Sequence, residues 1–195
     1  MTGPTELTMR RRSTDSVRTR RRIAACVLLL ATVPASQAAD TQTAAWQHHH
    51  VKFSYVGFTT LYSCSGLESK VQAILEFLGA RRDLTVSASG CMGGPDMPTH
   101  TAWVDADFYS PAPVADGSPD GVTARWTPFQ MNYQHPIFMG AGDCELMQSM
   151  KETLEKNLAA RRLTYHTDCF PHEVHDGDFK MSGEALEVTP REARK

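Results

Sequence analysis

The sequence lacks several features that mark membrane proteins and common enzymes. Beyond residue 38 it has no long apolar run that could form a membrane-spanning helix. It also has no C-x-x-C motif and no catalytic signature such as G-x-S-x-G or H-E-x-x-H. We therefore expect a non-enzymatic protein with no cofactor and, once an N-terminal signal is removed, no transmembrane segment.

Basic residues are scarce in the same region. Residues 1–38 hold seven of the 20 basic and two of the 22 acidic residues, so 13 basic and 20 acidic residues remain, a formal net charge of −7. No stripe of lysine and arginine offsets this negative charge. Nucleic acids and anionic membrane surfaces are themselves negatively charged, so neither is expected as a partner.

Residues 1–38 have the composition of an export signal. Arginines cluster at 10–12 and 18–22, an apolar run follows at 23–31, and small residues at 34–38 suit cleavage after Ala38. The apolar run is too short to span a bilayer as a stable helix. We expect removal of this signal peptide, Cys26 included, and a periplasmic or secreted chain. The general secretory and twin-arginine routes both stay open.

The other four cysteines form two similar pairs. The spacing from Cys64 to Cys91 nearly equals that from Cys144 to Cys169, and related segments lie between them at 78–82 and 158–162. In an exported protein this pattern predicts two disulfides, Cys64–Cys91 and Cys144–Cys169, although four cysteines allow three pairings. A reactive thiol is the alternative at Cys64 or Cys144, because the dipole of a helix N-terminus stabilises a thiolate.

Hydrophobic periodicity predicts helices and strands in alternation. Helices are expected over 65–78, beginning with a capping box of Ser65 and Glu68, and over 144–158, capped by Asp143. Alternating patterns predict strands at 51–58, 84–89, 102–108, 122–126 and 163–167, with a shorter pattern at 185–188. The strands at 102–108 and 122–126 are expected to form a hairpin that places Arg125 opposite Asp105 or Asp107.

The order β-α-β-β-β-α-β indicates a single α+β domain over residues 48–170. We expect a ferredoxin-like two-layer sandwich, in which an antiparallel or mixed sheet carries two helices on one face. Residues 39–47 are predicted to be a flexible N-terminal arm, and residues 171–195 a polar C-terminal tail.

Histidine and methionine near the cysteines suggest copper or zinc binding as an alternative. Its ligands would be either Cys91, Met92, Met97 and His100 or Cys169, His172 and His175, with at least some of the thiols free. The triplet His48-His49-His50 is interpreted as an adventitious metal binder in a flexible segment. Asp105 and Asp107 share a strand face, as paired acid–base groups do, but simple alternation also produces such a pair.

Two resemblances follow from particular segments. Residues 51–91, with Tyr55-Val56-Gly57-Phe58 and Ser63-Cys64, resemble small exported proteobacterial proteins of unassigned function, and residues 142–146 are similar to their second half. The strand order, with Val56-Gly57 before Cys64, is also similar to heavy-metal-associated domains, which share the ferredoxin-like fold. Those domains use two cysteines three residues apart, and Leu67 stands at the second position here. This resemblance implies the fold but not metal transfer.

The function expected from these observations is binding. The chain is predicted to be an exported, disulfide-stabilised domain that recognises a protein or small ligand through one sheet face or its loops. An exposed apolar patch that includes Trp103, Tyr109 or Phe129 would serve this purpose. The alternative is a periplasmic copper- or zinc-binding protein.

Overall fold

The computed structural model describes residues 41–169 and 177–189. The predicted signal peptide, His172, His175 and parts of the expected tail lie outside these residues. The described elements are β1 (Thr41–Val56), α1 (Cys64–Phe77), β2 (Thr85–Ser89), β3 (Thr101–Pro113), β4 (Val122–Asn132), α2 (Cys144–Asn157), β5 (Ala160–Thr167) and β6 (Phe179–Val188). None of the helices in this part of the chain is long and apolar enough to cross a membrane.

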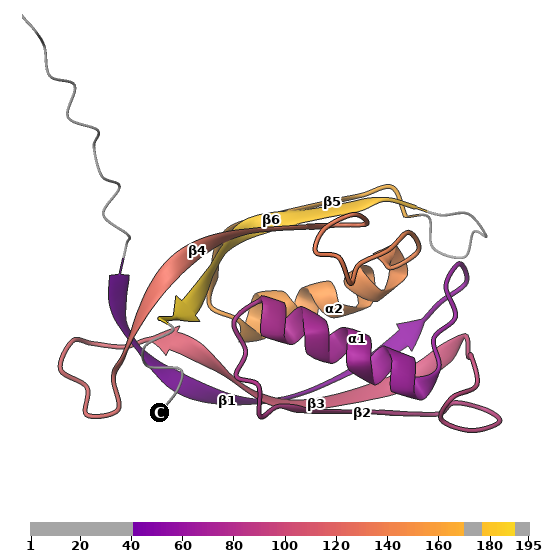
Figure 1. The fold of residues 1–195 in the computed structure, drawn as a ribbon, viewed down its shortest axis with the longest axis horizontal. Helices are drawn as coiled ribbons and strands as arrows, with labels where there is room; N and C mark the ends of the chain where they lie inside the picture. The colour runs from indigo at the N-terminus through magenta and orange to yellow at the C-terminus, as the bar shows by residue number, and fades with distance from the viewer. Residues whose placement is uncertain (1–40, 170–176, 190–195) are drawn as a thin grey trace, which may run out of the picture. The chain divides into compact units, whose positions relative to one another are not determined.

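The six strands form one antiparallel sheet in the order β2-β3-β1-β4-β6-β5. Figure 1 shows the sheet bent around the two helices, so that a first half-sheet (β2, β3, β1) and a second half-sheet (β4, β6, β5) lie on opposite sides of them. The predicted α+β class and antiparallel sheet are confirmed. The ferredoxin-like topology is not confirmed.

The strand boundaries differ from the predictions at both ends of the domain. Residues 41–47, expected as a flexible arm, belong to β1, where pairing with β3 and β4 orders small polar residues that carry little pattern of their own. Residues 179–188, expected in the polar tail, form β6, which pairs with both β4 and β5. The α+β domain therefore extends beyond the predicted range of 48–170 in both directions.

The predicted hairpin is wrong, because β1 lies between β3 and β4 in the sheet. Arg125 faces Thr41 on one side and Glu187 on the other, rather than Asp105 or Asp107.

Both predicted helices are present, but their capping differs. The hydroxyl of Ser63 caps α1 by accepting a hydrogen bond from the Gly66 amide at 3.0 Å. Glu68, expected in a capping box, instead accepts a hydrogen bond from the Ala88 amide in β2 at 2.7 Å. Asp143 occupies the N-cap position of α2 without a side-chain capping bond. Its carboxylate has other partners.

The chain contains two copies of a β-α-β-β unit, here called the first repeat (β1 to β3) and the second repeat (β4 to β6). In each half-sheet the second strand of the unit lies at the edge and the first lies next to the other repeat. Several equivalent residues recur at the same offset along the chain, as in Trp46 and Trp126, Cys64 and Cys144, Arg81 and Arg161. The arginine of each repeat stacks on its tryptophan, 5.5 Å from the ring centre in the first and 4.5 Å in the second.

The apolar faces of both helices pack into one core between the half-sheets. Buried residues come from α1, α2 and both half-sheets, among them Leu67, Ile74, Phe108, Met131, Leu146, Met150 and Phe179. Burying a side chain of this size stabilises a fold by about 1.5–3 kcal/mol. The bend of the sheet thus allows six strands and two helices to share one interior.

A disulfide joins the start of each helix to the end of the strand that follows it. The bonds are Cys64–Cys91 and Cys144–Cys169, the pairs predicted from the spacing, and the two Cα atoms of each bond are 5.9 Å apart. Cys64 and Cys144 are buried and disulfide-bonded, so they are not the free, exposed thiols that the reactive-thiol alternative requires. Two disulfides are consistent with an oxidising, exported environment.

Two buried carboxylates at the start of α2 bind the loop between β1 and α1. Glu145 accepts hydrogen bonds from the amides of Phe58 and Thr59 at 2.9 and 3.0 Å. Asp143 accepts hydrogen bonds from the Tyr62 hydroxyl and from the Lys70 ammonium, whose Nζ lies 2.9 Å away. The second repeat therefore holds the first through groups whose polar atoms are satisfied away from water.

Burial also changes the acidity of this cluster. Asp143 is only 3% exposed. Loss of hydration raises the pKa of its carboxyl from 3.8 to about 6, against a smaller opposing effect of the hydrogen bond from the Gly140 amide. Burial lowers the pKa of Lys70 for the same reason.

Removing either disulfide is expected to destabilise the chain. Replacing both cysteines of one pair with alanine should lower the free energy of unfolding by about 3–4 kcal/mol, because a loop of this length regains its freedom in the unfolded chain. Urea unfolding followed by circular dichroism measures the change. Reductant should lower the urea midpoint of the wild type. It should leave the midpoint of a variant that lacks both disulfides unchanged. An unchanged midpoint in both double variants would contradict the prediction.

The raised pKa of Asp143 predicts a specific pH dependence. Between pH 3.8 and about 6 the folded chain retains a proton that the unfolded chain has released, so this group's contribution to stability falls as pH rises. Relative to Asp143→Asn, the wild type should lose up to about 3 kcal/mol between pH 4 and pH 7. Urea unfolding at four pH values tests this, with Asp120→Asn, an exposed carboxylate, as the control. A wild type that gains stability relative to D143N over this range would refute it.

Candidate functional site

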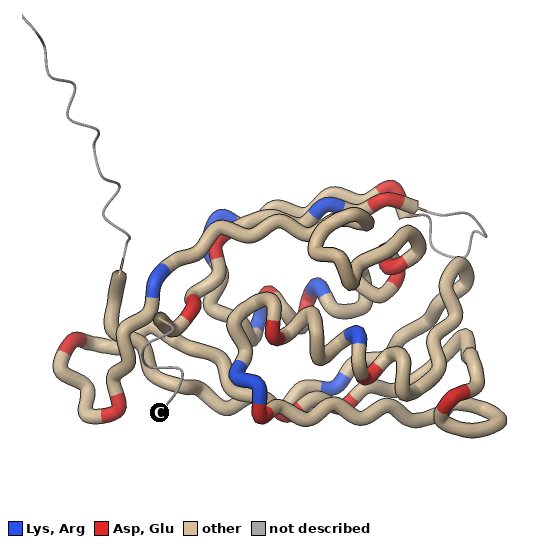
Figure 2. The backbone as a smooth tube through the Cα atoms, viewed as in Figure 1, with Lys and Arg blue, Asp and Glu red and all other residues tan. Residues whose placement is uncertain are grey.

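The outward side of the first half-sheet carries most of the chemically versatile side chains. Because strand residues alternate between faces, the residues that point away from the helices belong to one set on each of β1 and β3. We call this surface the first outer face, and it presents Trp46, His48, His50, Lys52, Ser54, Trp103, Asp105, Asp107 and Tyr109. Figure 2 shows acidic and basic residues interspersed along the described chain.

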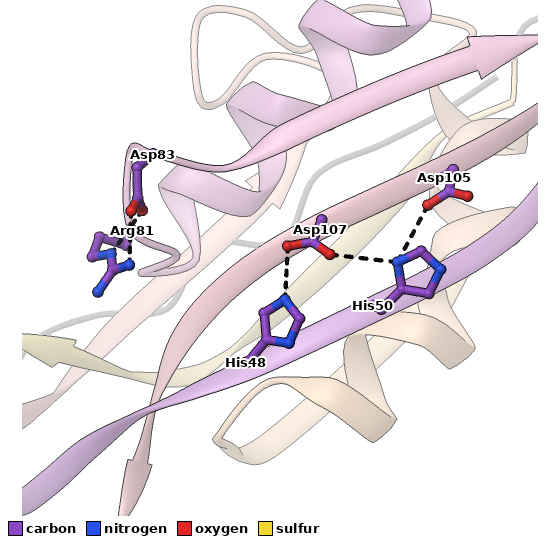
Figure 3. Close-up of polar contacts among 6 residues, drawn as sticks. All are labelled: His48, His50, Arg81, Asp83, Asp105 and Asp107. Carbon is purple, nitrogen blue, oxygen red and sulfur yellow. Dashed lines mark hydrogen bonds and ion pairs between the residues drawn. The ribbon is translucent and has the colours of Figure 1, made fainter.

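Two histidines and two aspartates on this face form a cluster, drawn in Figure 3. His48 Nε2 lies 2.7 Å from Asp107 Oδ1. His50 Nδ1 lies 3.5 Å from both Asp107 Oδ2 and Asp105 Oδ1. We call these four residues the His-Asp cluster. The neighbouring His48 lowers the pKa of Asp107, with a further contribution from His50.

Each end of the cluster is bordered by a fixed positive charge. At one end Lys52 Nζ lies 2.9 Å from Asp105 Oδ2. At the other, the Arg81 guanidinium makes two hydrogen bonds of 2.7 Å to Asp83 and lies 4.1 Å from the centre of the Tyr109 ring. These hydrogen bonds lower the pKa of Asp83. The His48 ring lies 4.9 Å from that of Tyr109, so the cluster adjoins this stack.

The histidine triplet is divided between the two faces of β1. His49 points inward, where it bonds to the Ser110 hydroxyl at 2.9 Å and stacks on Phe108. Burial lowers its pKa and so favours the neutral ring. The interpretation of the triplet as part of a flexible segment is wrong, because strand pairing fixes His48 and His50 on one side and His49 on the other.

The three residues expected in an exposed apolar patch have different surroundings. Trp103 is 68% exposed on the first outer face. Tyr109 is partly covered by Arg81, and Phe129 packs against the core. Trp103 is therefore the member of the three that is open to solvent.

The ligands predicted for copper or zinc have several different surroundings, and two of them, His172 and His175, lie outside the described residues. Cys91 and Cys169 are in disulfides, and the ring of His100 is bonded through Nδ1 to the Gly57 carbonyl at 2.9 Å. Met92 and Met97 are exposed in the connection between β2 and β3. Over residues 41–169 and 177–189, no three histidine, cysteine, aspartate or glutamate side chains already stand in a metal-binding arrangement.

The second repeat shows that the fold does not require the His-Asp cluster. At the positions equivalent to His48 and His50 it has Pro128 and Gln130. His50 faces Asp107 across the sheet, whereas Gln130 faces Ser182. The stacked tryptophan and arginine and the disulfide occur in both repeats, but the cluster occurs in one.

One space on the inner face, where the helices pack, is too small to hold a ligand. A space beside α2, lined by residues that include Leu78, Leu158 and Met181, measures about 10 Å³. A space of this size is comparable with that needed for one water molecule. The outer face is the better candidate for recognition.

The pattern that identifies this face is partly visible in the sequence. Alternation places Asp105 and Asp107 on one side of a strand, but it does not reveal their partners, because residues 41–50 carry no clear strand pattern. The internal repeat that links Trp46 with Trp126 is the signal that would have extended the first strand. Comparisons of the chain with protein-family models, with curated proteins and with solved structures find no match.

Proposed function

We propose that this chain is an exported, disulfide-stabilised binding protein that recognises a partner protein or ligand through its first outer face. The observation that carries the proposal is the combination of an exposed Trp103 with a His-Asp cluster that the second repeat lacks. The fold of the unit occurs twice, but Trp103 and the His-Asp cluster occur in the first repeat alone. We infer that these side chains serve a purpose other than folding.

The chemistry of the face suits recognition. An exposed tryptophan provides a large apolar contact, and tryptophan is enriched among residues that dominate binding energy. The neighbouring imidazoles and carboxylates supply hydrogen-bond donors and acceptors for the polar surroundings of such a contact. Lys52 and Arg81 add positive charge at the margins of an otherwise acidic surface.

Binding is favoured over catalysis by the setting of the titratable groups. Asp105 and Asp107 lie on an open strand face, with their side chains 37% and 45% exposed. Acid–base catalysis usually relies on a site that positions the substrate and excludes water. Recognition by a flat surface needs neither condition.

Copper or zinc binding is the alternative function. Of the ligands predicted for it, Met92, Met97 and His100 are accessible to solvent. Cys91 and Cys169 can act as thiolate ligands only if their disulfides are reduced. With both disulfides intact, this alternative rests on the methionine and histidine ligands alone.

Photo-crosslinking in cells that export the full chain tests partner recognition. A photoreactive phenylalanine derivative at position 103 should yield a discrete crosslinked product that excess unlabelled wild-type protein competes away. The same derivative at position 130, an exposed residue of β4 in the second repeat, is the control. After mass spectrometry identifies the product, Trp103→Ala should weaken its binding about fivefold or more. No product at position 103, or equal products at both positions, would refute the proposed face.

A further inference from the structure

The His-Asp cluster has side chains that commonly ligate metals, and its strands place them within reach of one another although they do not already stand in a metal-binding arrangement. His48 and His50 are two residues apart on β1 and so project from the same side of the strand. Asp107 lies directly opposite His50 on β3 and contacts both imidazoles, as Figure 3 shows. Two strands of a continuous sheet therefore fix the backbone positions of three groups that commonly ligate metals.

The separation between His50 and each aspartate is close to that between ligands of one ion. Imidazole nitrogen and carboxylate oxygen bind Zn²⁺ at about 2.0–2.1 Å, which places tetrahedral ligand atoms about 3.3 Å apart. His50 Nδ1 lies 3.5 Å from an oxygen of each aspartate. His48 Nε2 is closer to Asp107, at 2.7 Å, because the two share a direct hydrogen bond.

We propose that His48, His50 and Asp107 bind one divalent transition-metal ion, Cu²⁺ or Zn²⁺, on the first outer face. Mixed imidazole and carboxylate ligands suit both ions, and Cu²⁺ is expected to bind more tightly. The site uses none of the ligands predicted for the copper or zinc alternative, and it includes two histidines of the triplet that the sequence analysis interpreted as an adventitious metal binder. It also goes beyond partner recognition, because it concerns an ion rather than a macromolecular contact.

Binding requires only local rearrangement. The ion replaces the hydrogen bond between His48 and Asp107 with two coordination bonds, and each neutral imidazole donates a lone pair. The side chains of His48 and His50 are 50% and 51% exposed, so their rings have room to turn toward a common point. Lys52 already neutralises Asp105, which leaves Asp107 as the principal carboxylate ligand.

The second repeat supplies substitutions suited to testing the site. Gln130 and Ser182 are the residues of the same sheet that correspond to His50 and Asp107. His50→Gln and Asp107→Ser therefore introduce the side chains that the second repeat already has at the equivalent positions. His48→Gln removes the other imidazole. His166→Gln, at an exposed histidine on β5, is the matched control.

Calorimetric titration of the untagged, exported chain with CuCl₂ and with ZnCl₂ measures the site directly. We expect one ion per chain, and at least about tenfold weaker binding in H48Q, H50Q and D107S, with H166Q unchanged. Electron paramagnetic resonance of the Cu²⁺ form should show two coupled nitrogens in the wild type and one in H50Q. Circular dichroism verifies the fold of each variant. Because three ligand variants are measured separately, the test remains valid if one of them misfolds.

Two results would overturn the assignment. One is the absence of saturable binding of either ion to the wild-type chain. The other is equal affinity of the wild type and the three folded variants, which would place the ion elsewhere, for instance at the methionine-containing connection between β2 and β3. Failure of the metal titration would leave the crosslinking result at position 103 intact, so the two proposals are separately testable.

Discussion

The structure depends on one strand, β1, that pairs with strands of both half-sheets. Residues 44–56 of β1 pair with β3, whereas residues 41–44 pair with β4. Because the sheet bends around the helices, this continuity places a half-sheet on either side of α1 and α2 and creates one core from two repeats. The same pairing fixes the alternation along β1, so His49 points inward while His48 and His50 share the outer face.

The repeats are stabilised internally and joined by different interactions. Within each repeat, a disulfide links the helix start to the following strand and an arginine stacks on a tryptophan. Between them, Glu145 and Asp143 bind the loop of the first repeat. The two helix starts differ for a physical reason. The hydroxyl of Ser63 caps α1, whereas the buried carboxylate of Asp143 at the start of α2 contacts Tyr62 and Lys70 of the first repeat.

Local patterns predicted what local interactions determine. Apolar periodicity predicted both helices, and the matched cysteine spacing predicted both disulfides. The strand at 41–50 was missed because its order comes from nonlocal pairing, and β6 was underestimated because Ser182 and Gly183 interrupt its alternation. The false hairpin arose similarly, since only tertiary structure reveals that β1 separates β3 from β4. For the site, alternation predicted that Asp105 and Asp107 share a face, but not that His48 and His50 lie across from them.

The repeat separates the requirements of the scaffold from those of function. Trp46 and Arg81 have counterparts in Trp126 and Arg161, so their stacking is explained by the unit that both halves share. The His-Asp cluster has no such explanation, because an equivalent sheet folds with glutamine and serine in its place. A divalent ion at this cluster would neutralise negative charge and connect β1 with β3 on the surface that displays Trp103. Metal occupancy and partner recognition would then act on the same face and influence each other through its charge.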